Sequence, residues 1–297
     1  MTKLKRFEGN PILKPKKENE WESGAVFNCA TVYDGKLIHM LYRAIGEYDS
    51  YISRLGYAIS EDGFNFKRIS HPVFEPQEDY EAFGCEDPRI TKIDNRYYIT
   101  YTALFNRAFS GEGNRVALAS TNDFKSFTRY GVILPEFKDK DAVLFPEKIE
   151  GKYVMYHRIR PDIWIAYSDD LKRWYGHKVV MRPRKGSWDC QYIGSGAPPL
   201  KTEKGWLLFY HGVDENKVYR LGIALFDLND PSMLLARQEE PILEPKENYE
   251  LYGDVPNVVF TCGAIEKDTS FYVYYGGADK TICVATVDRN CVIESFR

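Results

Sequence analysis

Five short segments of the chain present acids, amides or small polar residues, and four of the five also contain proline. These segments are Asn28, Glu86-Asp87-Pro88-Arg89, Phe145-Pro146-Glu147-Lys148, Ser195-Gly196-Ala197-Pro198-Pro199 and Asp254-Val255-Pro256-Asn257. Three of them contain a carboxylate, and the chain is rich in tyrosine, with 22 residues of this type. Carboxylates supply acid and base at a glycosidic oxygen, and aromatic faces stack on the C–H surfaces of sugars. The residue types therefore indicate a carbohydrate pocket.

A repeat along the chain predicts the elements that would bring these segments together. Five similar apolar segments each contain a tyrosine near the end: Tyr42, Tyr101, Tyr156, Tyr210 and Tyr275. These tyrosines lie 59, 55, 54 and 65 residues apart. A turn dipeptide precedes each segment, and its strongest form is Asp34-Gly35, a typical hairpin signal. A further predicted strand, built around an alanine, follows each hairpin.

Five such units of about 57 residues predict an all-β chain, a five-bladed β-propeller with four antiparallel strands per blade. We expect a single domain over residues 1–297, with an N-terminal lead that is available to close the ring. The approximate blades are residues 25–75, 84–136, 141–182, 194–243 and 253–297. A two-sheet sandwich with coincidental spacing is the alternative.

The predicted propeller explains why the five segments matter together. The first strand of each blade lines the central channel, so polar residues that open these strands converge on one axis. Proline cannot donate to a sheet ladder and is expected at the first residue of a strand. The alternative is that an acid beside proline at such a junction only forms a turn.

The composition restricts the class of protein. Hydrophobic residues make up 44% of the chain and charged residues 28%, which excludes a disordered chain. The net charge of −3 argues against nucleic-acid binding. Without a long apolar run or an export signal, we expect no membrane contact and a cytoplasmic location. The six cysteines lack C-x-x-C spacing, so we expect reduced thiols and no metal site.

At these segments the sequence resembles glycoside hydrolase family 130, the β-mannoside phosphorylases and related β-mannosidases, which are five-bladed propellers. The matching motifs follow the order of the family over nearly the whole chain, at residues 86–89, 145–148, 194–199, 210–212 and 253–257. The resemblance implies an inverting, reversible reaction in which inorganic phosphate attacks the anomeric carbon of a non-reducing β-mannosyl unit. The linkage would be β-1,2 or β-1,4, and the product α-mannose 1-phosphate.

The resemblance also implies roles for single residues. Asp87 matches the general acid of the family, which acts through the 3-hydroxyl of the mannosyl unit. Phosphate would be a co-substrate, with no cofactor, and the partners would be β-mannooligosaccharides; a homo-oligomer is compatible with the family. The residues expected to hold the sugar are Asn28, Arg43, Arg54, Glu86 and Asp254.

Phosphate binding requires cations, for which arginine forks and lysine are best suited. The residues expected to bind phosphate are Arg115, Lys140, Arg158, Tyr210 and His211. The sequence departs from the family before Ile193, where members often carry a lysine and this chain has Gln191 and Tyr192. The nearest cations in sequence are Arg182, Arg184 and Lys185, which either replace that lysine from a shifted loop or are ordinary surface residues.

Two other functions remain open at this point. An inverting hydrolase of the same family would need a second carboxylate as base, roughly 6.5–9.5 Å from the acid; Glu147 and Asp254 are the candidates. A sugar-binding propeller without catalysis would use the aromatic residues and Asn28, but it has no need for Asp87 beside arginines.

Overall fold

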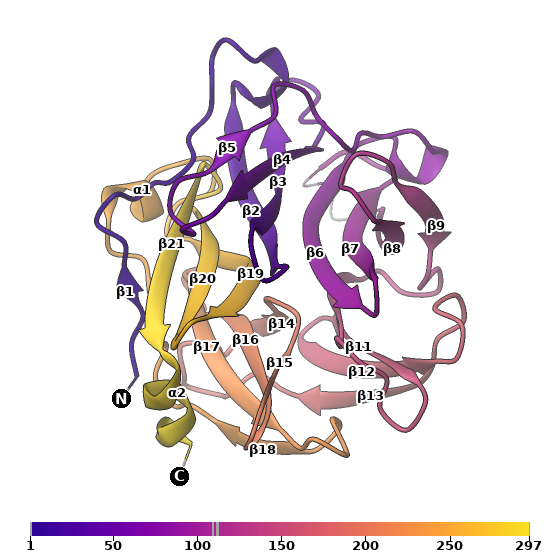
Figure 1. Cartoon of the computed structure of the whole chain (residues 1–297), viewed down its shortest axis with the longest axis vertical. Helices are drawn as coiled ribbons and strands as arrows, with labels where there is room; N and C mark the ends of the chain where they lie inside the picture. Colours follow the sequence, from indigo (N-terminus) through magenta and orange to yellow (C-terminus); the bar gives the residue numbers. More distant parts are fainter. Residues whose placement is uncertain (1, 109, 111–112, 297) are drawn as a thin grey trace.

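The strands of this protein form five small sheets arranged as a ring. The computed structural model describes residues 2–108, 110 and 113–296. Within these residues, each sheet is antiparallel and the five lie around a common centre (Figure 1). The predicted all-β, five-bladed propeller is confirmed.

In each blade the first strand lies nearest the centre and the last strand lies outermost (Figure 1). Blade 1 contains β2 (Ala25–Tyr33), β3 (Ile38–Ile45), β4 (Arg54–Ser60) and β5 (Lys67–Arg68). Blade 2 contains β6 (Cys85–Ile93), β7 (Arg96–Leu104), β8 (Asn114–Thr121) and β9 (Thr128–Val132). Blade 3 contains β10 (Lys140–Leu144), β11 (Tyr153–Ile159), β12 (Asp162–Ser168) and β13 (Tyr175–Met181).

Blades 4 and 5 depart from the simple four-strand meander. Blade 4 contains β14 (Tyr192–Ser195), β15 (Leu200–Thr202), β16 (Gly205–Val213), β17 (Tyr219–Phe226) and β18 (Leu234–Arg237). Both β14 and β15 pair with β16, so they are two halves of one interrupted inner strand. Blade 5 contains β19 (Val259–Lys267), β20 (Ser270–Gly277), β21 (Thr281–Asp288) and β1 (Lys5–Arg6).

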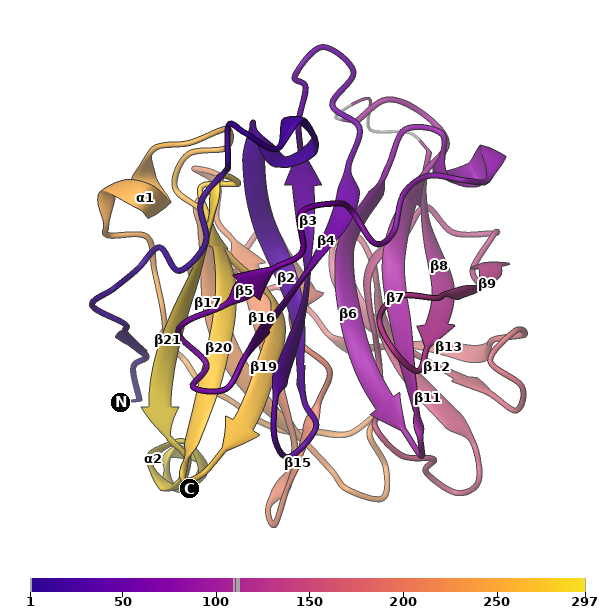
Figure 2. The same cartoon turned by 45° about the horizontal axis from the view of Figure 1, so that its top comes forward.

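The N-terminal segment supplies the outermost strand of the last blade. Lys5 of β1 lies opposite Thr286 of β21 in an antiparallel pair. The two ends of the chain consequently lie near each other at the rim, where the short helix α2 (Arg289–Ser295) follows β21 (Figures 1 and 2). Strands from the beginning and the end of the sequence therefore close the ring.

The opening segments of blades 3 and 4 differ from the sequence-based interpretation. β10 begins at Lys140, so residues 145–148 follow the inner strand of blade 3 instead of opening it. Similarly, β14 begins at Tyr192, and residues 196–199 separate the two halves of the blade 4 inner strand. Because proline only requires a position where no N–H is needed, it ends or interrupts a strand as readily as it begins one.

Four of the five recurring tyrosines bind a buried carboxylate that also pairs with an arginine of the same blade. In blade 2, the Tyr101 hydroxyl donates to Glu81 at 2.5 Å, and Arg129 pairs with the same carboxylate at 3.1 Å. Tyr101 lies on the second strand and Arg129 on the fourth, while Glu81 precedes the first. We call this arrangement the blade clasp. The equivalent sets are Tyr42, Glu22 and Arg68; Tyr210, Asp189 and Arg237; and Tyr275, Glu250 and Arg6.

Blade 3 differs, because the Tyr156 hydroxyl donates to the backbone carbonyl of Pro231 in the next blade, at 2.6 Å. Apolar packing joins the same two blades: Phe145 and Tyr156 lie in one buried cluster with Trp206.

Among the described residues, no helix is long and apolar enough to cross a membrane. The six cysteines are unpaired.

Candidate active site

The inner strands of blades 1, 2 and 3 are interrupted at equivalent positions. Asn28, Asp87 and Asp141 have positive φ angles of 46°, 48° and 56°. Each lies at a shift in the register between the first and second strands of its blade. Such bulges turn a side chain away from the alternation of the sheet, and asparagine and aspartate tolerate the left-handed backbone better than most residues. All three side chains line one cavity.

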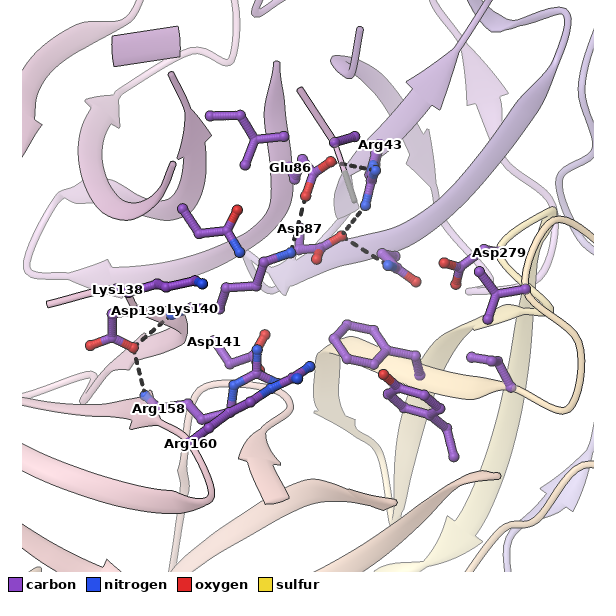
Figure 3. Close-up of a pocket in the computed structure, with 18 of the residues that line it drawn as sticks. Arg43, Glu86, Asp87, Lys138, Asp139, Lys140, Asp141, Arg158, Arg160 and Asp279 are labelled. Atoms are coloured by element: carbon purple, nitrogen blue, oxygen red, sulfur yellow. Dashed lines mark hydrogen bonds and ion pairs between the residues drawn. The ribbon is translucent and has the colours of Figure 1, made fainter. Parts of the chain in front are cut away.

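This cavity has a volume of about 690 Å³, within the range of small-molecule sites. It opens among the inner strands of blades 1, 2, 3 and 5, and Figure 3 shows many of its polar residues. Among the described residues its lining consists of Asn28, Arg43, Glu86, Asp87, Leu104, Ala108, Asn114, Lys138, Asp139, Lys140, Asp141, Arg158, Ile159, Arg160, Tyr219, Val255, Val258, Phe260 and Asp279.

Asp87 is held on several sides. Asn28 Nδ2 donates to Asp87 Oδ1 at 2.8 Å, and Arg43 Nη1 approaches the same oxygen at 3.1 Å (Figure 3). The guanidinium of Arg89 donates to the Asp87 carbonyl at 2.9 Å. Burial by itself would raise the pKa of Asp87, but the charges of Arg43, Lys140 and Arg89 outweigh it and keep the pKa below the usual carboxyl value. Asp87 is therefore ionised near neutral pH.

Glu86 links the cations on either side of it. Its Oε1 lies 2.5 Å from Arg43 Nη2, and its Oε2 lies 3.2 Å from Lys140 Nζ (Figure 3). Arg43 also donates to Ser53 Oγ at 2.8 Å. Since Glu86 and Arg43 are both buried, their orientations are fixed before any ligand binds.

The wall contributed by blade 3 is cationic. The four cations on this wall are Lys138, Lys140, Arg158 and Arg160 (Figure 3). Asp141 Oδ2 pairs with Arg158 Nη1 at 2.8 Å, and its other oxygen accepts a hydrogen bond from Arg89 at 2.9 Å. Burial would raise the pKa of Asp141, but the two arginines hold it well below the usual value. The cations outnumber the carboxylates here, which suits an anionic ligand.

Arg160 lies beside Tyr192, one of the two residues at which the sequence departs from the family. Its guanidinium lies over the Tyr192 ring, 4.0 Å from the centroid. Tyr192 OH in turn lies 2.6 Å from the hydroxyl of the cavity residue Tyr219. Of the three cations considered as substitutes, Arg184 pairs with Asp189 at 2.8 Å, and neither Arg182 nor Lys185 is among the described lining residues. The charge comes from the third blade, not from the loop before the fourth.

The structure brings together six of the residues predicted for the site and places His211 directly behind one wall. The six that line the cavity are the predicted acid Asp87 and, around it, Asn28, Arg43, Glu86, Lys140 and Arg158. His211 is fully buried, with Nε2 3.5 Å from Asp141 Oδ2. Burial lowers the pKa of His211 to about 3, so the imidazole is neutral.

Three predicted residues lie at the rim of the cavity or beside it. Asp254 precedes the lining residue Val255 and accepts hydrogen bonds from Tyr48 at 3.1 Å and Lys280 at 3.2 Å. Arg54 pairs with Glu47 at 3.3 Å, and neither is among the described lining residues. Arg115 follows the lining residue Asn114 and donates to its carbonyl at 2.9 Å and to that of Pro135 at 3.2 Å.

Two predicted site residues lie elsewhere. Tyr210 is the tyrosine of the blade 4 clasp: its hydroxyl donates to Asp189 at 2.9 Å and accepts from Arg237 at 3.0 Å, so it is not available to phosphate. Glu147 follows the far end of β10, is exposed and pairs with Lys201 at 2.6 Å. Its position does not support the role of a base. Both assignments have a structural explanation. In the sequence, a tyrosine that recurs in each blade and an acid that follows the end of a strand look like site residues.

Several lining residues were not predicted, although some had a signal. Lys138 and Lys140, like Arg158 and Arg160, are two residues apart, a spacing that places side chains on the same face of a strand. Asp279 had no such signal, since it lies in the turn after β20. Burial raises its pKa to about 7, and the nearby Asp87 adds to the shift.

A five-bladed propeller whose central cavity holds a carboxylic acid against arginines, and cations on the facing wall, defines a carbohydrate-active site that can take an anion. The chain belongs to glycoside hydrolase family 130. The family model described as beta-1,4-mannooligosaccharide phosphorylase matches residues 3–297.

Characterised relatives cover almost the whole chain. A 1,2-beta-oligomannan phosphorylase from Thermoanaerobacter sp. is 53% identical over 97% of this chain and 98% of its own. A beta-1,2-mannobiose phosphorylase from the same organism is 50% identical over 98% and 99%. A beta-1,4-mannooligosaccharide phosphorylase from Ruminococcus albus is 33% identical over 95% and 88%.

Solved structures agree with this assignment. The complex of a beta-1,2-mannobiose phosphorylase from Listeria innocua with beta-1,2-mannobiose superposes with a TM-score of 0.88, at 30% identity and 99% coverage of both chains. A structure from work on family glycoside hydrolases that target beta-1,2 mannosidic linkages has a TM-score of 0.87, at 30% identity and coverage of 97% and 94%. The family therefore includes both phosphorylases and hydrolases with this fold.

Proposed function

We propose that this protein is an enzyme that cleaves non-reducing-end β-mannosidic bonds with inorganic phosphate, with inversion, to give α-D-mannose 1-phosphate and a shortened sugar. The reaction is reversible. The relatives named above favour a β-1,2 linkage over β-1,4, because the two most similar of them act on β-1,2-mannosides. Phosphate is a co-substrate, and we expect the reaction to take place in the cytoplasm.

The cationic wall of blade 3 is the observation that carries this proposal. Lys140, Arg158 and Arg160 line the cavity that Asp87 also lines (Figure 3). Arginine forks and lysine are the side chains best suited to a phosphate dianion. A phosphorylase needs only one carboxylic acid from the protein, because phosphate itself is the nucleophile. The arrangement of one acid and several cations matches this requirement.

The same cations explain how Asp87 can become an acid. In the empty site, positive charge keeps its carboxyl ionised. A bound phosphate dianion would neutralise part of the charge of Lys140, which is one of the groups that lower the pKa of Asp87. Phosphate binding would therefore raise the pKa of Asp87 and favour the protonated form. The proton would then reach the leaving oxygen through the 3-hydroxyl of the mannosyl unit, as the family resemblance implies.

The opposite wall is suited to the sugar. Asn28, Arg43 and Glu86 present fixed donors and acceptors around Asp87, as hydroxyl recognition requires. Asp279 lies on the same side (Figure 3). Asp254, beside the lining residue Val255, would contact a sugar unit at the rim of the cavity.

A hydrolase remains the second candidate because family members with this fold cleave with water. The two bases considered from the sequence are poorly placed: Glu147 follows the far end of β10, and Asp254 is engaged by Tyr48 and Lys280. The cationic wall has no role in attack by water.

The proposal is tested by incubating the protein with β-1,2- and β-1,4-mannobiose, with and without phosphate. We expect α-mannose 1-phosphate in the presence of phosphate only, and faster turnover of the β-1,2 disaccharide. Free mannose released at the same rate without phosphate would instead establish the hydrolase. Binding of either sugar without any turnover would indicate a non-catalytic protein.

A further inference from the structure

Three polar side chains form a continuous chain from the cavity outward through blade 3. Asp139 lines the cavity, His157 lies behind it on β11, and His177 lies on the outer strand β13. Asp139 Oδ2 is 2.5 Å from His157 Nδ1, and His157 Nε2 is 3.1 Å from His177 Nδ1. Asp139 and His157 are buried, whereas His177 is partly exposed. The established family motifs in this sequence include none of the three.

The other oxygen of Asp139 holds the backbone of two cations of the phosphate wall. Asp139 Oδ1 accepts hydrogen bonds from the N–H of Lys140 at 2.6 Å and of Arg158 at 2.9 Å (Figure 3). Lys140 and Arg158 are paired at the end of the β10–β11 ladder, and the register shifts immediately after them. Because the regular ladder is interrupted at this point, the carboxylate fixes where both cations leave the sheet.

The two histidines in turn fix the carboxylate. Burial and the neighbouring His157 lower the pKa of His177, while a hydrogen bond to the Trp174 backbone opposes them. His177 Nδ1 and His157 Nε2 share one hydrogen bond, in which the tautomers decide which nitrogen donates. The two ring nitrogens of His157 therefore link it to His177 on one side and to the Asp139 carboxylate on the other. Phe137 packs edge-on against His177, with 4.9 Å between ring centroids, and covers the pair.

We infer that Asp139, His157 and His177 are positioning residues for phosphate. The histidines hold the Asp139 carboxylate in the one orientation that sets Lys140 and Arg158 against the dianion. The inference rests on the proposed phosphorylase function and extends it to two histidines outside the cavity lining. The inference predicts that these three residues affect phosphate binding but have little effect on sugar binding, because the sugar wall is built from blades 1, 2 and 5.

The test compares leucine and asparagine at each histidine. His157→Leu removes the donor to Asp139, whereas His157→Asn retains an N–H close to the position of Nδ1. We expect the KM for phosphate to rise about tenfold in His157→Leu and to recover in part in His157→Asn, while the KM for β-1,2-mannobiose stays within about twofold in both. His177→Leu and His177→Asn repeat the comparison at the partly exposed end of the three linked side chains. Here asparagine retains a hydrogen-bond acceptor near the position of the histidine Nδ1.

His39 provides a matched control. It also pairs with an aspartate, Asp34, at 3.0 Å, but it lies in blade 1, outside the described cavity lining. His39→Leu should leave the KM for phosphate unchanged. If His157→Leu does not fold, the two variants at residue 177 decide, and direct phosphate titration by calorimetry gives the same comparison without turnover.

Two results would overturn the inference. One is an unchanged KM for phosphate in folded His157→Leu and His177→Leu. The other is that both KM values rise while kcat and Tm fall, with no difference between leucine and asparagine. This result would show that the three side chains only stabilise the blade. Experiments on the wild-type protein distinguish failure of this inference from failure of the proposed function. Cleavage without phosphate contradicts the proposed function itself. Phosphate-dependent cleavage by the wild type, together with an unchanged KM for phosphate in the variants, contradicts only the positioning role of the three side chains.

Discussion

Asn28 and Asp87 occupy equivalent positions in neighbouring blades and are joined by a 2.8 Å hydrogen bond from Asn28 Nδ2 to Asp87 Oδ1. Both have left-handed backbone conformations, and both interrupt the ladder of their blade. Such conformations are costly for residues other than glycine, and they persist where the surrounding structure enforces them. The orientation of the proposed acid therefore depends on the junction between two blades.

Replacing Asp87 with asparagine should separate binding from turnover. Asp87→Asn retains the size of the side chain but removes the proton that the reaction needs. We expect kcat to fall by about 10²- to 10⁴-fold, the usual contribution of a general acid, while calorimetry still detects phosphate and mannobiose. Asp34→Asn, at a hairpin outside the described cavity lining, serves as the control and should leave kcat unchanged. A kcat of Asp87→Asn within tenfold of the wild type would exclude Asp87 as the acid.

Arg160 should contribute to phosphate affinity. Arg160→Ala removes a cavity cation that stacks on Tyr192. Since a hydrogen bond to a charged group contributes about 1.5–3 kcal/mol, we expect the KM for phosphate to rise roughly 10- to 100-fold.

Arg182→Ala is the comparison for this prediction, because the sequence left open whether Arg182 replaces the lysine or is an ordinary surface residue, and it is exposed in the structure. Its KM for phosphate should match that of the wild type. If Arg182→Ala impairs phosphate use and Arg160→Ala does not, the assignment of the missing cation to blade 3 is wrong.

Asp279 should make the stability of the empty enzyme depend on pH. Its pKa rises from 3.8 to about 7 on folding, chiefly because of burial. Between these pH values the folded state binds the proton more tightly than the unfolded state does, so stability falls as pH rises from about 4 to about 7. Each unit of pKa shift corresponds to about 1.4 kcal/mol, reduced here by partial access to solvent.

Asp279→Asn removes this dependence, because the amide stays neutral. We expect the Tm of the variant to exceed that of the wild type at pH 8 by more than it does at pH 5. Thermal denaturation of both proteins at the two pH values measures the difference, and other titrating groups cancel in the comparison. An equal Tm difference at both pH values would mean that Asp279 does not titrate in this window.

The blade clasp predicts unequal effects of one substitution in two blades. Tyr101→Phe removes a hydrogen bond to the buried carboxylate of Glu81, whereas Tyr156→Phe removes one to the neutral carbonyl of Pro231. We expect the free energy of unfolding to fall by about 2 kcal/mol in the first variant and by about 1 kcal/mol in the second. Urea denaturation measures both values. Equal losses would show that the carboxylate of the clasp adds nothing to the bond.

The sequence determined the fold because a propeller repeats local structure. Each hairpin turn and each clasp tyrosine recurs with the period of one blade, and the signals that mark them span only a few neighbouring residues. Asp87 could be assigned for a related reason, since its motif is contiguous. The same pattern also gave misleading signals for the site. Tyr210 recurs because it belongs to the repeat of the blades, and Pro146 follows the end of β10 instead of opening a strand.

The tertiary structure alone decided which side chains meet at the centre. Asp279 lies far from Asp87 in sequence, yet both line one cavity. Arg160 stacks on Tyr192 of a different blade, and His157 and His177 form a hydrogen-bonded chain with the cavity residue Asp139. These relationships depend on bulges and on the packing of whole blades. A bulge shifts which side chains face the axis, and blade packing determines which of them share the cavity, so spacing along the chain does not encode these contacts.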